Sequence, residues 1–189
     1  MSILMTSSLQ NHFLIAMPAL TDSFFYHSVV YMCEHNEHGA MGLIINRPTQ
    51  VMLTDLLSQL SINNQSEHVA TTPVLFGGPV EKGQGMVLHN SHDQWKTTVE
   101  LGDNIYLTTS TDILATLGTA DGPSQSLVTL GYAGWTEGQL EQELADNSWL
   151  TVPADDDILF NTPPNKRWQA AAELLGIDIN LISNSSGHA

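Results

Sequence analysis

The sequence predicts a protein of the α/β (α+β) class, in which helices cover a mixed β-sheet. Two observations lead to this expectation. In the first half of the chain, apolar segments rich in β-branched and aromatic residues follow one another across glycine-containing turns, as the strands of hairpins do. In the second half, such strands alternate with segments that begin with helix-capping residues. We expect one domain over residues 1–189, with a small subdomain inside it and flexible ends at 1–10 and 183–189.

The predicted hairpins begin with residues 12–18, an apolar strand that Pro18 ends. Asp22 and Ser23 can then cap a short turn or helix. The segment CEHNEHGAMGLIINRP (33–48) contains the polar turn 36–39 between two apolar strands. The predicted strands, in chain order, are 12–18, 29–35, 40–46, 74–78, 85–90, 95–101, 104–110, 126–135 and 149–154.

Helices are predicted where leucines recur every three or four residues or where capping residues appear. Leucines at 53, 56, 57 and 60 form one helical stripe. Thr109 or Ser110 can begin a second helix that Gly118 ends. Two more helices are expected over 136–147, where Thr136 and Gln139 form a capping box, and over 162–176.

The charge balance excludes some functions. The chain has 5 Lys and Arg against 20 Asp and Glu, a formal net charge of −15. Because phosphate backbones and anionic lipids are bound mainly by Lys and Arg, we expect no direct contact with nucleic acid or with a membrane surface. A single cysteine cannot form an internal disulfide, and no basic residue precedes Arg47 as a signal peptide would require. We therefore expect a soluble cytoplasmic protein.

Cys33, His35 and His38 are the first candidates for chemistry, since they lie within six residues of one another. Residues two apart on a strand share a face, so Cys33 and His35 could point the same way, with His38 as a third zinc ligand. Alternatively, the thiol of Cys33 could act as a nucleophile with His35 as its base. A buried thiol beside two turn histidines explains the same residues without any activity, so we assign no catalytic residue, metal ligand or cofactor here.

Several turns rich in backbone N–H groups suggest a groove for a small anion or a protein segment. Each has a plain structural alternative, which is a tight connection, an N-cap or a packing tryptophan. The candidate ligand or partner groove comprises Cys33, His35, Asn46, Gly77, Gly78, Thr109, Ser110, Gly131 and Trp135.

An ordered set of blocks resembles the bacterial YqgE/AlgH family over about residues 9–189. The blocks are HFLIAMP, SVVYMCEHNEHGAMGLIINRP, FGGPV, GMVLH, TTSTDIL, LGYAGWTEGQLEQEL and RWQAAAELLGID. The resemblance implies a cytosolic bacterial protein with a three-layer αβα core and a smaller α/β subdomain. It brings no catalytic residues, and one branch of the family is named for a proposed role in regulating alginate genes.

Three functions follow as hypotheses. The first is a non-catalytic binding or regulatory protein of unknown ligand, in which any transcriptional regulation is indirect. The second is a thiol- or metal-dependent hydrolase centred on Cys33 and His35. The third is a DNA-binding regulator, which the scattered positions of the five basic residues disfavour.

Overall fold

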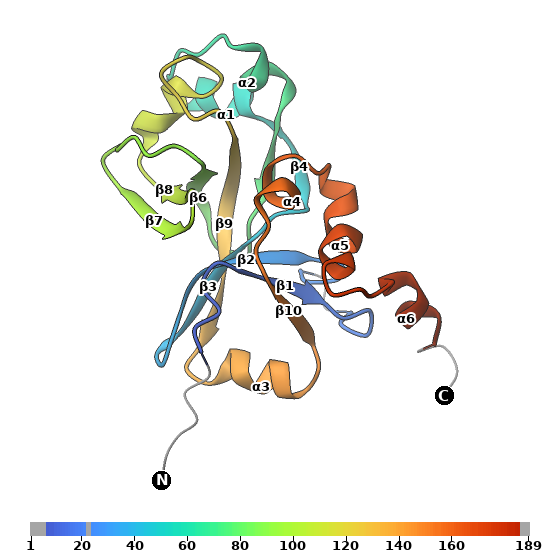
Figure 1. Ribbon diagram of the computed structural model, residues 1–189. Helices are drawn as coiled ribbons and strands as arrows, with labels where there is room; N and C mark the ends of the chain where they lie inside the picture. Colours follow the sequence, from blue (N-terminus) through green and yellow to red (C-terminus); the bar gives the residue numbers. More distant parts are fainter. Residues whose placement is uncertain (1–6, 22–23, 186–189) are drawn as a thin grey trace.

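The computed structural model describes residues 7–21 and 24–185 and is shown in Figure 1. The strands are β1 (His12–Ala16), β2 (Val29–Asn36), β3 (Gly39–Ile44), β4 (Pro48–Met52), β5 (Pro73–Phe76), β6 (Val80–His89), β7 (Thr98–Gly102), β8 (Ile105–Thr108), β9 (Ser126–Thr136) and β10 (Trp149–Pro153). The helices are α1 (Leu53–Gln59), α2 (Glu67–Thr71), the 3₁₀ helix η1 (Thr111–Thr116), α3 (Gln139–Ala145), α4 (Asp156–Phe160), α5 (Pro164–Glu173) and α6 (Ile179–Ser185).

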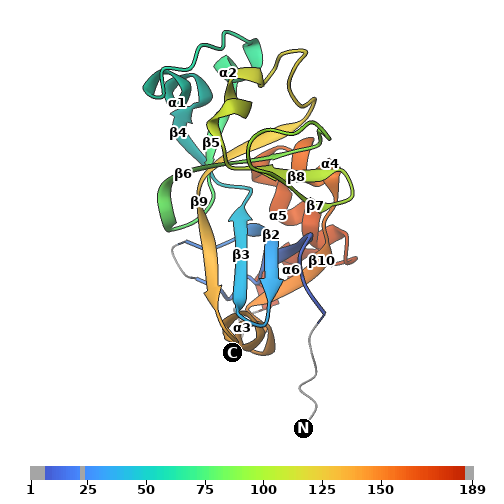
Figure 2. The same ribbon diagram turned by 90° about the vertical axis from the view of Figure 1, so that its left-hand side faces the viewer.

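The strands form one mixed sheet with the order β10-β1-β2-β3-β9-β6-β8-β7. Neighbours along this path are antiparallel, while β5 joins β9 in parallel and carries β4 on its other edge. Strand β9 is the element shared by both ends of the molecule. Its final residues pair with β3, and its first residues pair with β5 and β6, as Figure 2 shows.

Alternate residues of β2 enter two different cores, which makes this half of the molecule a three-layer sandwich. Val29 and Tyr31 join the cluster covered by α4, α5 and α6. Val30 and Met32 join the cluster that contains Leu140 of α3 on the opposite face. The period-2 alternation of a strand buried on both faces produces this division. The predicted α+β class with helices on both faces of the sheet is confirmed.

A third apolar cluster makes a smaller lobe at the other end of β9 (Figure 1). We call it the α1–α2 lobe, since Leu53 and Leu57 of α1 and Val69 of α2 pack there with Ile113 of η1. Their partners in the sheet come from β5, β6 and β9.

Most of the predicted elements are present, with several exceptions. Strand β4 and helices α4 and α6 were not predicted, and β6 begins at Val80, five residues before the predicted strand 85–90. The helix expected after Ser110 is a single 3₁₀ segment, and α2 lies inside 62–73, where no helix was predicted. The helix expected from Thr136 starts at Gln139 because β9 extends through Thr136, although the Gln139 amide oxygen still accepts the Thr136 N–H. The predicted caps Asp22 and Ser23 lie outside the described residues.

The structure describes part of each end that was expected to be flexible, residues 7–10 and 183–185. Leu9 is buried against the sheet, and α6 continues through Ser185. Residues 1–6 and 186–189 lie outside the described part of the chain. Within the part that is described, no helix has the length and hydropathy needed to span a membrane.

Candidate functional site

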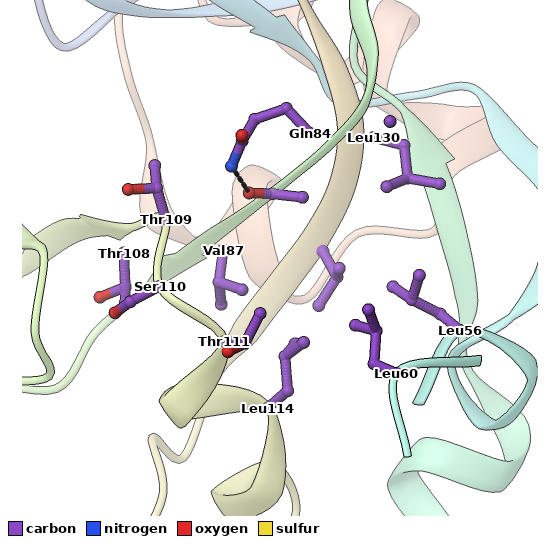
Figure 3. A pocket seen from close by; sticks show the side chains of 13 residues that line it. Leu56, Leu60, Gln84, Val87, Thr108, Thr109, Ser110, Thr111, Leu114 and Leu130 are labelled. Carbon is purple, nitrogen blue, oxygen red and sulfur yellow. Dashed lines mark hydrogen bonds between the residues drawn. The ribbon is translucent and has the colours of Figure 1, made fainter. Parts of the chain in front are cut away.

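A cavity of about 210 Å³ lies between α1, η1 and strands β6 and β9 (Figure 3). Apolar side chains from the α1–α2 lobe and the sheet supply much of its lining: Leu56, Leu60, Val87, Leu114, Val128 and Leu130. The rest of the lining consists of residues 83–85 of β6 and the run from Thr108 to Thr111. None of these lining residues carries a charge. Leu60 remains 45% exposed, so an apolar side chain borders the opening.

Buried hydrogen bonds hold the hydroxyl of Thr108. The Ser91 N–H donates to His89 Nδ1 at 3.2 Å, so the neutral ring carries its proton on Nε2 and donates it to Thr108 Oγ1 at 2.8 Å. Thr108 Oγ1 also lies 2.8 Å from Thr98 Oγ1. The side chain of His89 is fully buried, and this burial lowers its pKa to about 4. The Thr108 hydroxyl is therefore fixed by a neutral histidine.

The next two hydroxyls of the lining are also engaged. Thr109 Oγ1 lies 2.9 Å from Thr97 Oγ1, and Ser110 Oγ donates to Asp112 Oδ1 at 2.5 Å. The hydrogen bond from Ser110 and those from the backbone N–H groups of Lys96 and other residues hold the pKa of Asp112 below its usual range, although burial opposes them. Both predicted groove residues, Thr109 and Ser110, thus line the cavity, but their hydroxyls bond within the protein.

Gln84 differs from Thr108, Thr109 and Ser110, because its side chain bonds to no other side chain in the described part of the chain, a property that it shares with the exposed Thr111. Its Nε2 donates to the neighbouring Gly85 carbonyl at 3.0 Å, and its Oε1 accepts no hydrogen bond from the described residues. It lies where β6 leaves its register with β9, between Val80 and Gly85, and β8 pairs with β6 only from Val87 onward. Bulges of this kind often redirect a side chain beside a binding site.

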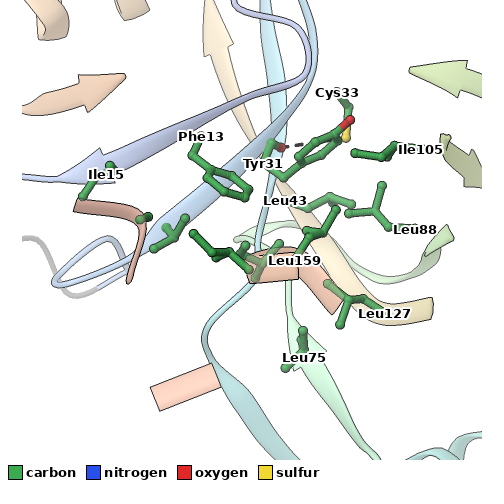
Figure 4. Packing of buried hydrophobic residues seen from close by; sticks show 14 of the residues in the cluster. Phe13, Ile15, Tyr31, Cys33, Leu43, Leu75, Leu88, Ile105, Leu127 and Leu159 are labelled. Carbon is green, nitrogen blue, oxygen red and sulfur yellow. Dashed lines mark hydrogen bonds between the residues drawn. The ribbon is translucent and has the colours of Figure 1, made fainter. Parts of the chain in front are cut away.

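Cys33 lies in the core and not at the cavity (Figure 4). Its thiol is buried beside Tyr31, whose carbonyl it approaches at 3.9 Å, and burial raises the pKa of the thiol well above its usual range. A β-bulge in β2 leaves Cys33 without a partner residue on β3, since Met32 pairs with Gly42 and Glu34 pairs with Met41. One unpaired residue reverses the alternation beyond it.

As a result, His35 faces α3 and not the core that holds Cys33. The Leu9 N–H donates to His35 Nδ1 at 2.9 Å, and His35 Nε2 donates to Glu141 Oε1 at 2.7 Å. The hydrogen bond from His35 lowers the pKa of Glu141. The expectation that Cys33 and His35 share a face is therefore wrong. No group of three His, Cys, Asp or Glu side chains in the described part of the chain is arranged to hold a metal ion.

The glycines of the predicted groove meet one another. A Cβ on Gly77 would lie 2.3 Å from the carbonyl oxygen of Gly131. Gly131 has φ 77°, and a Cβ on it would lie 2.3 Å from the carbonyl oxygen of Gly78. Their backbone groups are used: Gly77 N–H donates to Leu130 O at 2.8 Å, and Gly77 O accepts from Ile44 N–H at 2.8 Å. These glycines allow a close backbone crossing between β9 and the connection from β5 to β6.

The two remaining predicted residues are structural. Asn46 accepts from Val29 N–H and donates to the His27 carbonyl, both at 2.9 Å, and so ties the segment before β2 to the end of β3. Trp135 is buried and donates to Glu143 Oε1 at 3.3 Å. Its edge also borders an open surface hollow of about 320 Å³ beside the β2–β3 turn. The nine predicted residues therefore do not form a single groove.

Leu56, Leu114 and Gln84 line the cavity but were not among the predicted site residues. The leucine stripe of α1 predicts which face of the helix is directed inward, but it does not predict whether side chains fill the space opposite that face. For Gln84 the available signal was its position between two glycines, in the sequence KGQG.

Comparisons with known proteins agree with this architecture. The model of a family described as AlgH-like (DUF179) matches residues 13–180. A UPF0301 protein of Thioalkalivibrio sulfidiphilus is 52% identical over 184 residues, which cover 97% of this chain and 98% of that one. A UPF0301 protein of Shewanella loihica is 52% identical over 183 residues, covering 96% and 99%.

Two solved structures are similar as well. The solution structure of the AlgH protein from Pseudomonas aeruginosa has a TM-score of 0.79 and 45% identity, with both chains fully covered. A crystal structure of a protein from Corynebacterium diphtheriae has a TM-score of 0.72 at 17% identity and covers 96% of this chain, which is a likeness of fold. The family match and these relatives establish that the chain belongs to the AlgH-like family.

Proposed function

We propose that this protein is a non-catalytic binding protein that takes a small uncharged molecule with an apolar body into the cavity between α1, η1 and β6. The observation that carries the proposal is an uncharged cavity of about 210 Å³ in a chain of net charge −15. An apolar cavity of roughly 150 Å³ is large enough for benzene in another protein. The expected ligand is therefore the size of one or two rings or of a short branched chain.

The lining supports a neutral ligand over the small anion suggested by the glycine turns. The N–H of Gly77 is already bonded, and no lysine or arginine lines the cavity. An anion transferred there from water would lose its hydration without gaining a cation. The same absence of charge disfavours a cationic ligand.

The separation of Cys33 from His35 supports the non-catalytic reading over a thiol-dependent hydrolase. A nucleophile needs a base within hydrogen-bond distance and access to its substrate. Cys33 is buried in the core that α5 covers, whereas His35 bonds to α3 on the opposite face. The raised pKa of the thiol also opposes thiolate formation.

Regulation, in this proposal, passes through a protein partner that senses the occupied α1–α2 lobe. Leu56 and Leu60 belong to α1 and its C-terminal end and line the cavity, so a ligand would contact the lobe directly. With only five Lys and Arg in the sequence, direct DNA binding is not part of the proposal.

The test is an NMR titration of the ¹⁵N-labelled protein with toluene, a neutral probe that fits the volume. Saturable shifts are expected at the amides of Gly83, Gly85 and Thr109. A side chain added at Gly85 meets no atom within 4 Å of its Cβ, so Gly85→Leu should fill the cavity without disturbing the backbone. This variant should weaken toluene binding at least about 10-fold.

The matched control is Gly134→Leu on the exposed part of β9, where a Cβ meets nothing closer than 3.8 Å. It should bind toluene as the unaltered protein does. Shifts spread over the surface, or equal binding by Gly85→Leu and Gly134→Leu, would show that the cavity is not the site.

A further inference from the structure

In the described residues, two polar side chains of the lining bond to no other side chain, Gln84 and Thr111. Thr111 is exposed and Gln84 is half-buried, so Gln84 is the better placed to select the ligand of this cavity. Thr108, Thr109 and Ser110 bond to other side chains, so their hydroxyls have partners before any ligand arrives. Among the residues that the structure describes, the side chain of Gln84 bonds only to the adjacent Gly85 carbonyl. That bond links no other element to β6, and a ligand can replace it at little cost to the fold.

The surroundings of Gln84 leave it room to turn. Cβ atoms added at Gly83 or Gly85 would meet no atom within 4 Å, so open space lies on both sides of the glutamine. Figure 3 shows the side chain of Gln84 at the edge of the cavity, with its amide turned to the Gly85 carbonyl. The register shift of β6 against β9 frees this stretch from regular pairing.

A carboxamide offers a donor and an acceptor side by side. A ligand with the complementary pair, such as a primary amide or a lactam, can form two parallel hydrogen bonds with it. Loss of one of these hydrogen bonds should weaken binding by up to about 10-fold, and loss of the pair by more.

We infer that Gln84 is the specificity-determining residue of the cavity, and that the ligand is an uncharged molecule with an apolar ring or chain that ends in an amide-like donor–acceptor pair. This inference rests on the proposed function. The proposed function specifies the apolar body of the ligand, which contacts the leucines, and this inference specifies its polar group.

Four probes of nearly equal shape test it: benzamide, acetophenone, benzoate and benzamidinium. Acetophenone lacks the N–H donors of benzamide, benzoate carries a negative charge and benzamidinium a positive one. In the NMR titration, benzamide should bind the unaltered protein about 10-fold more tightly than each of the other three. Toluene is included as the reference for the apolar part alone.

Two variants of Gln84 give the decisive comparison. Gln84→Met keeps the size of the side chain and removes the amide, so the ratio of its affinities for benzamide and acetophenone should fall to about one. Gln84→Glu replaces the N–H donor by a charged acceptor and should reverse the preference, with benzamidinium favoured over benzamide by about 10-fold. Unchanged melting temperatures show that both variants fold.

The outcomes separate the two proposals. If toluene and all four ring probes bind alike and the Gln84 variants change nothing, Gln84 is not a specificity residue although the cavity remains a site. If no probe binds, toluene included, the proposed function fails and this inference fails with it.

Discussion

His89 is a buried ionisable residue that serves structure next to the cavity. Its ring stacks with Tyr106 at a centroid distance of 5.8 Å and meets Trp95 edge-on at 5.1 Å. Both of its nitrogens are hydrogen-bonded in the neutral form, to Ser91 N–H and to Thr108. Protonation would place a second donor against the Ser91 N–H and a charge in the core. The wall of the cavity therefore depends on an uncharged histidine.

The lowered pKa of His89 predicts an acid-sensitive fold. The ordinary pKa is 6.5 and the folded value is about 4, so between these pH values the unfolded chain binds a proton that the folded protein does not. The free energy of unfolding should therefore fall as the pH drops from 6.5 towards 4, by about 2 to 3 kcal/mol from this residue. Urea titrations at a series of pH values measure this change in the free energy of unfolding.

His89→Gln should flatten that part of the pH profile, because the amide can bond to the same partners without titrating. Its absolute stability will be lower owing to lost ring packing, so the slope is the readout. The control is His38→Gln, which removes an exposed imidazole from the β2–β3 turn and keeps the buried ring of His89 in place. An unchanged slope in His89→Gln would contradict the role given to this ring.

At the scale of elements, the crossing of β9 with the connection from β5 to β6 fixes the α1–α2 lobe to the rest of the sheet. Gly77, Gly78 and Gly131 approach so closely that backbone contacts backbone. A hydrogen bond from Gly77 N–H to Leu130 O continues the parallel pairing of β5 with β9. Side chains are excluded there, so the position of the lobe is set by main-chain geometry.

Gly78→Ala should therefore be strongly destabilising. Its Cβ would lie 2.0 Å from the carbonyl carbon of Tyr132, and Gly78 has φ 156°, which L-residues rarely adopt. We expect a loss of more than about 2 kcal/mol in urea denaturation. Gly83→Ala is the matched control, since a Cβ there meets nothing within 4 Å, and should change the stability by less than about 0.5 kcal/mol. Similar losses in the two variants would contradict the crossing as described.

These elements also show how far the sequence could predict the molecule. The hairpin around residues 36–39 and the helices over 53–60 and 162–176 follow from periodicity and turn residues, which are local signals. The facing of His35 depends on a bulge that leaves no mark in composition. The glycines of 77–78 and 131 read equally as anion-binding turns or as a close crossing, because only the partner strand decides between them. The cavity depends on a space between distant elements, which no stretch of sequence encodes alone.

At the scale of the whole molecule, charge is the dominant property. The net charge of −15 is spread over 189 residues, with few cations to balance it. In the described residues, the salt bridges are two His–Glu pairs, His35 with Glu141 and His38 with Glu37. Like charges held close in the compact state repel one another, which lowers the stability of the folded protein.

Salt should therefore stabilise this protein. Raising NaCl from about 0.02 M to about 0.5 M shortens the Debye length from roughly 20 Å to roughly 4 Å and screens the repulsion. We expect a rise in the melting temperature by calorimetry, and the same rise with KCl if screening is the cause. A melting temperature that stays constant or falls would show that self-repulsion does not limit stability.

The late position of β9 in the chain has a consequence for synthesis. Strands β3, β5 and β6 leave the ribosome well before residues 126–136, yet all three take β9 as a neighbour. Strand β1 waits still longer for its partner β10 at residues 149–153. The apolar residues that pack against β9 and β10 therefore stay without those partners until most of the chain has been made. Long-range pairing of this kind slows folding and favours aggregation, and nascent chains of this protein are expected clients of chaperones that bind unpaired strands.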